Sequence, residues 1–322
     1  MHLLVPFASD LTEACRHVLA DLPLPNLERA LALLAPAARD EADEYSHSPP
    51  HERALAAARG WRGSDGALPF AAHAATLDGI DVAHVPPVAW ALLSPAHWQL
   101  GRDHVTLLDP DELALGTDES RALFESFRPL LESAGFVAAW GSAGRWYAGR
   151  ADLDGLATAS LDRVIGRSVD LWLRASKLGD SPSQAAARSV VRRLQSEAQL
   201  LFHTHPVNEA REARGELAVN SFWLSGCGVA QTIAASSTPV LDVSLRAPLL
   251  GADWTAWADA WRVLDAGPIA ALLAVARAGA PAALTLCGER TAARFEARPR
   301  SLVQKLRGAW RKSEPHRVLA AL

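Results

Sequence analysis

The chain has 322 residues, of which 49% are hydrophobic and 21% charged, and its formal net charge is −4. Its length suits two domains or one large α/β unit, and its composition excludes a disordered or fibrous protein. The charge gives no signal for nucleic-acid binding. No apolar run approaches the roughly 18 residues of a membrane span, and the N-terminus lacks a signal peptide. Three separated cysteines without a CxxC pair favour a reduced, cytoplasmic setting.

Residues 1–84 are predicted to form the N-terminal part of an α/β core. The apolar run 3–7 predicts the first strand. Asn26 is a candidate N-cap for a helix that ends at Pro36, and a short helix is expected at 51–59.

Residues 85–150 predict a smaller ββαββ subdomain, a candidate insertion into the larger unit. Two hairpins are expected, one around "QLGR" and one around "GSAGR". Between them lies a helix capped by Thr117 or Asp118 and ended by Gly135. Its predicted buried stripe comprises Leu123, Phe124, Phe127 and Leu131.

Residues 151–322 alternate helix and strand, which predicts the C-terminal part of the α/β core. Ser181 and Gln184 form a capping-box pattern with proline between them, and Pro206 stops the helix. "LAVNSFWLSGCG" predicts a strand entering a glycine turn. Tryptophans 254, 257 and 261 form one helical stripe, which we interpret as core, and 298–312 predicts a basic amphipathic helix docked on that core.

The stretch 203–220 concentrates polar side chains in a chain rich in alanine and leucine. His203 and His205 share a face in extended chain, Asn208 starts a short helix, and Arg211 offers a fork for a carboxylate or phosphate. With Asn220, these residues form our candidate site for a small anionic metabolite. The alternative is structural: a histidine bonded to backbone, an asparagine cap, and an arginine paired with a neighbouring glutamate. No carboxylate stands at metal-ligand spacing, so we predict no metal here.

A second candidate site is the first hairpin. His97, Asp103 and His104 can meet across it as an acid–base or metal pair. The alternative is that Asp103 and His104 only shape the turn.

Several stretches carry a family resemblance. "HPVNEAREARGELAVNSFWLSGCG" resembles the archaeal-type cofactor-independent phosphoglycerate mutases of the alkaline-phosphatase-like superfamily. "SPAHWQLGRDHVTLLDP", "VIGRSVDLWL" and "SEAQLLFHTHPVN" are similar to the bacterial regulatory-protein family RpfE, which is itself phosphoglycerate-mutase-like. The resemblance implies an alkaline-phosphatase-like fold, a mixed or parallel sheet flanked by helices.

The mutases transfer a phosphoryl group through a serine beside two divalent metals. By the resemblance, Pro6 stands where they have a metal-binding aspartate, with only Asp10 retained, and Gly288 and Glu289 replace a late Asp-His pair. The resemblance therefore implies a catalytically degenerate regulatory or ligand-sensing protein without a cofactor. Two alternatives stay open: an active phosphomutase or phosphatase with rearranged manganese or zinc ligands, and a protein-interaction module.

Overall fold

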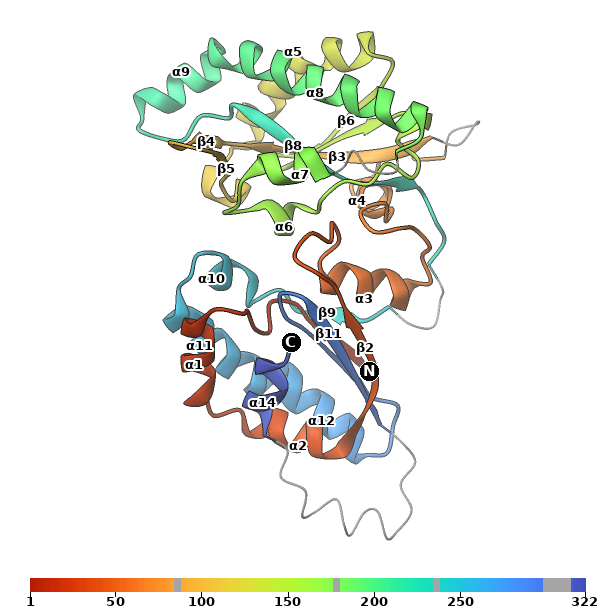
Figure 1. Cartoon of the computed structure of the whole chain (residues 1–322), viewed down its shortest axis with the longest axis vertical. Coiled ribbons are helices and arrows are strands. Elements are labelled where there is room, and N and C mark those ends of the chain that lie inside the picture. The colour runs from red at the N-terminus through yellow and green to blue at the C-terminus, as the bar shows by residue number, and fades with distance from the viewer. Residues whose placement is uncertain (84–87, 176–179, 234–237, 298–313) are drawn as a thin grey trace. The chain divides into compact units, whose positions relative to one another are not determined.

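The computed structural model describes residues 1–83, 88–175, 180–233, 238–297 and 314–322. The backbone forms two compact units (Figure 1). The first unit comprises residues 1–44, 49–60 and 233–322, and the second comprises 45–48 and 61–232. The predicted helix at 298–312 lies outside the described residues.

The first unit is built on a mixed five-stranded sheet. Strand β1 (His2–Val5) runs parallel to β10 (Ala283–Cys287) on one side and to β9 (Val240–Leu241) on the other. Beyond β10 the sheet is antiparallel, through β11 (Thr291–Ala297) to β2 (Leu34–Glu41). The sequence analysis anticipated β1 but missed β2, because the residues of β2 do not alternate between apolar and polar side chains and six of the eight are exposed.

Helices flank this sheet. Helix α3 (Pro50–Arg59) contacts β1, β2, β10 and β11. It confirms the short helix predicted at 51–59. The other helices are α1 (Glu13–Ala20), α2 (Pro25–Leu33), α10 (Arg246–Leu250), α11 (Trp254–Leu264), α12 (Ala270–Arg277) and α14 (Pro315–Ala320). Trp257 and Trp261 of α11 are fully buried in the core that these helices share with β1 and β10, so the tryptophan stripe is core, as predicted.

The start of α2 differs from the prediction. The helix begins at Pro25, so Asn26 lies inside its first turn and is not the cap. The buried carboxylate of Asp265, from a π-helical turn (Asp265–Ile269), accepts hydrogen bonds from the backbone N–H groups of Asn26 at 3.1 Å and Leu27 at 2.7 Å. A distant side chain therefore replaces the expected local cap. At the other end the helix stops at Leu33, before Pro36, which lies within β2.

The second unit is built on an antiparallel sheet. Its strand order is β6 (Val137–Ser142), β7 (Arg145–Gly149), β3 (Ala89–Ala96) and β8 (Ser221–Val229). The predicted hairpins are present, β4 (Trp98–Leu100) with β5 (Val105–Leu107), and β6 with β7. Because β8 pairs with β3, the sheet joins residues from the predicted 85–150 subdomain to residues from 151–322, and the units divide the chain at other points than predicted.

Helices α5 (Thr117–Ser133) and α8 (Pro182–His203) pack on one face of this sheet and share a core with β3 and β7. Leu123, Phe124 and Phe127 of the predicted α5 stripe are fully buried. Gly116, rather than Thr117 or Asp118, is the N-cap of α5. The predicted capping box at Ser181 is confirmed. The remaining helices are α4 (Phe70–Leu77), α6 (Leu161–Val164), α7 (Val169–Ala175), α9 (Pro206–Ala213) and the 3-10 turns Pro110–Leu113 and Ala151–Leu153.

The glycines of β8 do not form a turn. The strand continues through them, and Gly226 lies at φ +69 where two residues of β8 face one residue of β3, which is a β-bulge. A Cβ on Gly226 would lie 2.9 Å from the backbone N of Ala71 in α4. Glycine is therefore required by both the backbone conformation and the close approach of α4.

The predicted α/β class with a mixed sheet flanked by helices is confirmed. Among the described residues, no helix combines the length and hydrophobicity that a membrane crossing needs.

Candidate functional site

The structure gives the two predicted asparagines structural roles. Asn208 is buried, and its side-chain N–H₂ group donates to the carbonyls of Phe202 at 2.8 Å and Val219 at 2.7 Å, while its Oδ1 accepts from the Val219 N–H. Asn220 bonds both the N–H and the carbonyl of Trp98. These amides join the end of α8 to β8 and β8 to β4, and Asn208 does not cap α9.

Arg211 is also committed to the protein. Its side chain is 1% exposed. Its Nε donates to the Leu217 carbonyl at 2.8 Å, its Nη1 to Glu119 at 2.6 Å, and its Nη2 to the Leu113 carbonyl. Every nitrogen of the guanidinium group therefore has a protein acceptor, and no face of it is presented to an anion.

The two histidines lie at a helix junction. His203 is the exposed last residue of α8. His205 is the N-cap of α9, and its Nδ1 accepts from the Val207 N–H at 3.2 Å. Burial of the His205 imidazole lowers its pKa, which keeps the ring neutral and suits an acceptor. The predicted site residues thus come together in space, but as the joint between α8, α9 and β8.

The hairpin residues do not form a pair. His97 donates from Nδ1 to the Ala218 carbonyl, 2.8 Å away, because a carbonyl oxygen can only accept. Asp103 and His104 are exposed in the turn between β4 and β5. Their positions agree with the alternative in which Asp103 and His104 only shape the turn.

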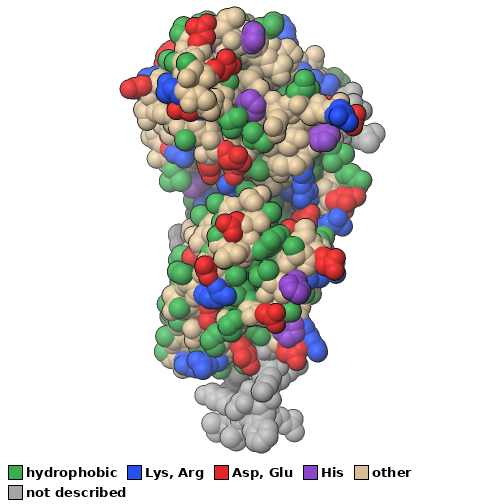
Figure 2. Space-filling view, turned by 90° about the vertical axis from the view of Figure 1, so that its left-hand side faces the viewer, with side chains coloured by type: hydrophobic (Ala, Val, Ile, Leu, Met, Phe, Trp, Pro, Cys, Tyr) green, Lys and Arg blue, Asp and Glu red, His purple; other side chains and the backbone are tan. Residues whose placement is uncertain are grey.

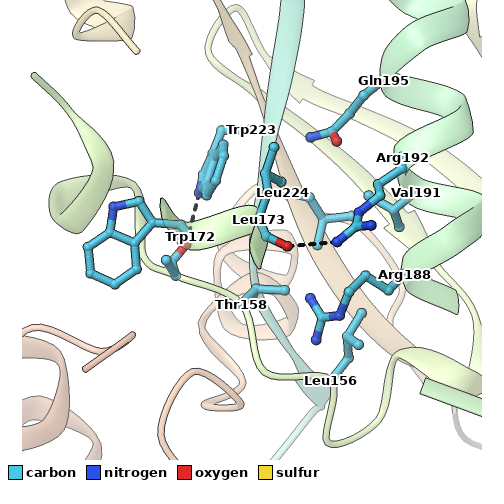
Figure 3. A pocket seen from close by; sticks show the side chains of 11 residues that line it. Leu156, Thr158, Trp172, Leu173, Arg188, Val191, Arg192, Gln195, Trp223 and Leu224 are labelled. Atoms are coloured by element: carbon cyan, nitrogen blue, oxygen red, sulfur yellow. Dashed lines mark hydrogen bonds between the residues drawn. The ribbon is translucent and has the colours of Figure 1, made fainter. Parts of the chain in front are cut away.

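A different set of polar side chains surrounds a pocket beside the edge strand β8 (Figure 3). We call it the β8 pocket. Its volume is about 40 Å³, and its walls come from α7, α8, β8 and the segment before α6. Since a water needs about 10–15 Å³ by this measure, the pocket has room for about three waters or one carboxylate group. It is lined by Leu156, Thr158, Ala159, Trp172, Leu173, Arg188, Val191, Arg192, Gln195, Trp223 and Leu224.

One wall of the β8 pocket is polar. Arg188, Arg192 and Gln195 follow at i, i+4 and i+7, so they lie on one side of α8, and Figure 3 shows all three pointing toward β8. Arg188 is neutralised, because its Nε and Nη2 donate to the carboxylate of Asp180 at 2.8 and 3.1 Å.

Arg192 and Gln195 retain bonding capacity. Arg192 donates from Nη2 to the Leu173 carbonyl at 2.7 Å, and Gln195 donates from Nε2 to the Phe222 carbonyl at 3.4 Å. No described residue provides a carboxylate for Arg192, a partner for its other nitrogens, or a partner for the Gln195 Oε1. The pocket therefore combines an uncompensated positive charge with an amide oxygen.

The other wall is aromatic and aliphatic. Trp223 is 3% exposed and donates from its indole N–H to the Ala159 carbonyl at 2.8 Å, which fixes the ring (Figure 3). Trp172 is 2% exposed. Leu156 and Leu224 complete the apolar lining. An apolar wall beside a cation strengthens the attraction between that cation and a bound anion, because it excludes water.

Comparison with known proteins finds similarity in structure only. No protein-family model matches the chain, and no curated protein matches it with significance. The cofactor-independent phosphoglycerate mutase from Thermoplasma acidophilum DSM 1728 is 16% identical, with 91% of this chain and 89% of that chain covered and a TM-score of 0.39. The PH0037 protein from Pyrococcus horikoshii is 13% identical, with 92% and 87% covered and a TM-score of 0.45. Both TM-scores lie below 0.5.

The residues at the carboxyl end of β1 do not fit a two-metal centre. Pro6 offers no side-chain donor, and the Asp10 carboxylate accepts from the Thr12 N–H at 2.5 Å. Glu289 accepts from the Leu11 N–H at 3.4 Å. Within the described part of the chain, no three His, Cys, Asp or Glu side chains are placed to hold a metal ion together.

The cysteines are poor nucleophiles. All three are buried. Burial raises the pKa of the Cys15 thiol to about 11 and that of Cys227 to about 12, and it raises the pKa of Cys287 further. At neutral pH these groups stay protonated, and a thiol is far less reactive than a thiolate.

The sequence analysis missed the β8 pocket. It considered the two ends of α8, the capping box and the stop at Pro206, and passed over the polar residues between them. The available signal was Gln195, a polar residue that follows the apolar Leu194 in the helix. In the structure Gln195 is buried, with 6% of its surface exposed. Its partners, Trp172 and Trp223, lie elsewhere in the chain, so only the fold brings them to it.

Proposed function

We propose that this protein binds a small carboxylated metabolite in the β8 pocket and has a regulatory or ligand-sensing role. The observation that carries the proposal is Arg192, a cation without a carboxylate partner among the described residues, beside the free Oε1 of Gln195 and an apolar wall. A carboxylate accepts from Arg192, and a neighbouring hydroxyl or N–H group of the same ligand donates to Gln195.

The pocket size favours a carboxylate over a phosphate as the buried group. A volume of about 40 Å³ holds about three waters, which is close to the three heavy atoms of a carboxylate and less than the five of a phosphate. The rest of the ligand would then lie against Trp172 and Leu156 or extend toward solvent. The sequence analysis expected a small anionic metabolite at Arg211. The proposal restricts the class of ligand to carboxylates and assigns the site to Arg192 instead.

The sequence resemblance to phosphoglycerate-mutase-like and RpfE proteins supports a degenerate catalytic centre. Pro6 stands at a metal-ligand position of that pattern, and the Asp10 carboxylate is used in a local turn. A two-metal phosphoryl transfer without its ligands loses the electrostatic stabilisation that such enzymes depend on. On the face shown in Figure 2, basic and acidic side chains of the described residues are interspersed, so this face carries no basic stripe of the kind that binds nucleic acid.

The test is calorimetric titration of the purified protein with acetate, benzoate, phenylacetate and phenyl phosphate. We expect a carboxylate to bind more tightly than the phosphate ester. Arg192→Gln should weaken that binding about tenfold or more, since a charged hydrogen bond contributes about 1.5–3 kcal/mol. Arg193→Gln is the matched control, because it makes the same change on an exposed neighbour that pairs with Glu197.

The same titration separates the alternatives. Equal binding by the two variants, or no carboxylate binding by the wild type, would contradict the proposal. Hydrolysis or transfer of the phosphate that depends on Mn²⁺ or Zn²⁺ and stops with a chelator would favour the active enzyme. A stoichiometric protein partner in the absence of any carboxylate response would favour the interaction module.

A further inference from the structure

The second unit contains another and larger pocket, which shares no lining residue with the β8 pocket. Its volume is about 270 Å³, against about 40 Å³ for the β8 pocket. It is lined mainly by Leu92, Ser94, Leu113, Leu115, Arg145 and Leu161. We call it the β3 pocket.

The β3 pocket lies on the face of the antiparallel sheet opposite α5 and α8. Leu93 packs in the core with those helices, and alternate residues of a strand point to opposite faces, so Leu92 and Ser94 point away from that core. Leu113 at the end of the 3-10 turn Pro110–Leu113, Leu115 after it, and Leu161 at the start of α6 provide aliphatic walls.

Ser94 is the polar group inside the pocket. Ser94 is 3% exposed, and its hydroxyl has no hydrogen-bond partner in the described part of the chain. Because Ser94 lines the pocket, this hydroxyl is available to a ligand that binds there. Because a hydroxyl both donates and accepts, an alcohol, a carbonyl or an amide satisfies it.

The charges around the pocket disfavour an anion. Arg145 donates from Nε and Nη2 to the two oxygens of Asp78 at 2.8 and 2.7 Å, so its charge is compensated. Tyr147 donates to the same carboxylate at 2.7 Å. Asp111, an exposed residue of the lining, adds a negative charge at the rim.

We propose that the β3 pocket binds a small, neutral, largely apolar molecule with one hydroxyl or carbonyl group, which hydrogen-bonds to the Ser94 Oγ. This is a second ligand site, independent of the carboxylate proposed for the β8 pocket. The apolar walls bury the body of the ligand, and Ser94 determines its orientation.

The experiment compares benzyl alcohol with toluene by ligand-observed NMR titration on the full chain. The two probes differ by the hydroxyl group alone. We expect the wild type to bind benzyl alcohol several-fold more tightly than toluene, and Ser94→Ala to remove that preference while toluene still binds. Ser196→Ala, at an exposed position of α8, is the matched control and should keep the preference.

Two further measurements keep the proposal falsifiable. Leu161→Trp should fill the pocket and abolish binding of both probes, and this variant tests the location even if Ser94→Ala fails to fold. Arg192→Gln should leave benzyl alcohol binding unchanged, which separates this proposal from that for the β8 pocket. The proposal is overturned if neither probe binds the wild type, if benzoate competes with benzyl alcohol for the site, or if Ser94→Ala keeps the preference for benzyl alcohol over toluene.

Discussion

Arg211 shows what a buried cation does in this protein. It reaches across 92 residues of sequence to the Glu119 carboxylate, and it also bonds the carbonyls of Leu113 and Leu217. Burial opposes ionisation of the Glu119 carboxyl, but hydrogen bonds from Gly116, Arg214 and Arg211 bring its pKa below the ordinary value. Arg211 therefore ties α9 to α5 and to the turn before α5.

Replacing this side chain should be costly. Arg211→Ala leaves Glu119 without its buried partner and two carbonyls without donors, so we expect a loss of about 3 kcal/mol or more in the free energy of unfolding. Arg214→Ala is the control, because Arg214 pairs with the same Glu119 but is 47% exposed. Urea unfolding followed by circular dichroism measures both. Equal losses in the two variants would contradict the structural role assigned to Arg211.

At the scale of elements, β1 depends on contacts that are remote in sequence. It runs parallel to β10, and the His2 Nε2 lies 2.9 Å from the Thr285 hydroxyl. Burial of the His2 imidazole, aided by the positive charge of Arg294, lowers its pKa from 6.5 to about 4. The folded protein therefore releases a proton that the unfolded chain still binds between these values.

The resulting pH dependence has a definite sign. Where the unfolded state binds more protons, stability rises with pH, so the stability present above pH 6.5 should fall as the pH drops toward 4. In His2→Gln, which keeps a donor for Thr285, the fall in unfolding free energy between pH 7 and 4.5 should be smaller. His17→Gln changes an exposed histidine of α1 and serves as control. A wild-type slope in His2→Gln would refute the assignment.

At the scale of the whole molecule, each unit has its own hydrophobic core. The core of the first unit includes Trp257 and Trp261, that of the second includes Phe127 and Trp146, and the two share no residue. Units with separate cores unfold separately unless the contacts between them are strong.

We therefore expect two thermal transitions in scanning calorimetry. Arg211→Ala should lower the transition of the second unit alone. Asp265→Ala, which removes the acceptor for the first N–H groups of α2, should lower the transition of the first unit alone. A single transition that moves with either variant would show that the two cores unfold as one.

Local patterns in the sequence were sufficient for several elements. The capping box from Ser181 to Gln184 and the stripe of α5 form from residues within one or a few turns, so their geometry depends little on the rest of the chain. The two hairpins are equally local. The sequence by itself thus determined the α/β class, the longest helices and the two hairpins.

The tertiary structure decided the rest. Asp265 caps α2 from 239 residues away. The edge strand β8 of the second unit's sheet pairs with β3, which is far from it in sequence. Arg211 and Arg192 have the same side chain, and only their neighbours in space distinguish them. Arg211 is buried and bonded through every guanidinium nitrogen, whereas Arg192 has no carboxylate partner among the described residues. Those neighbours come from other elements, because hydrogen bonds and burial depend on distance in space and not on separation along the chain.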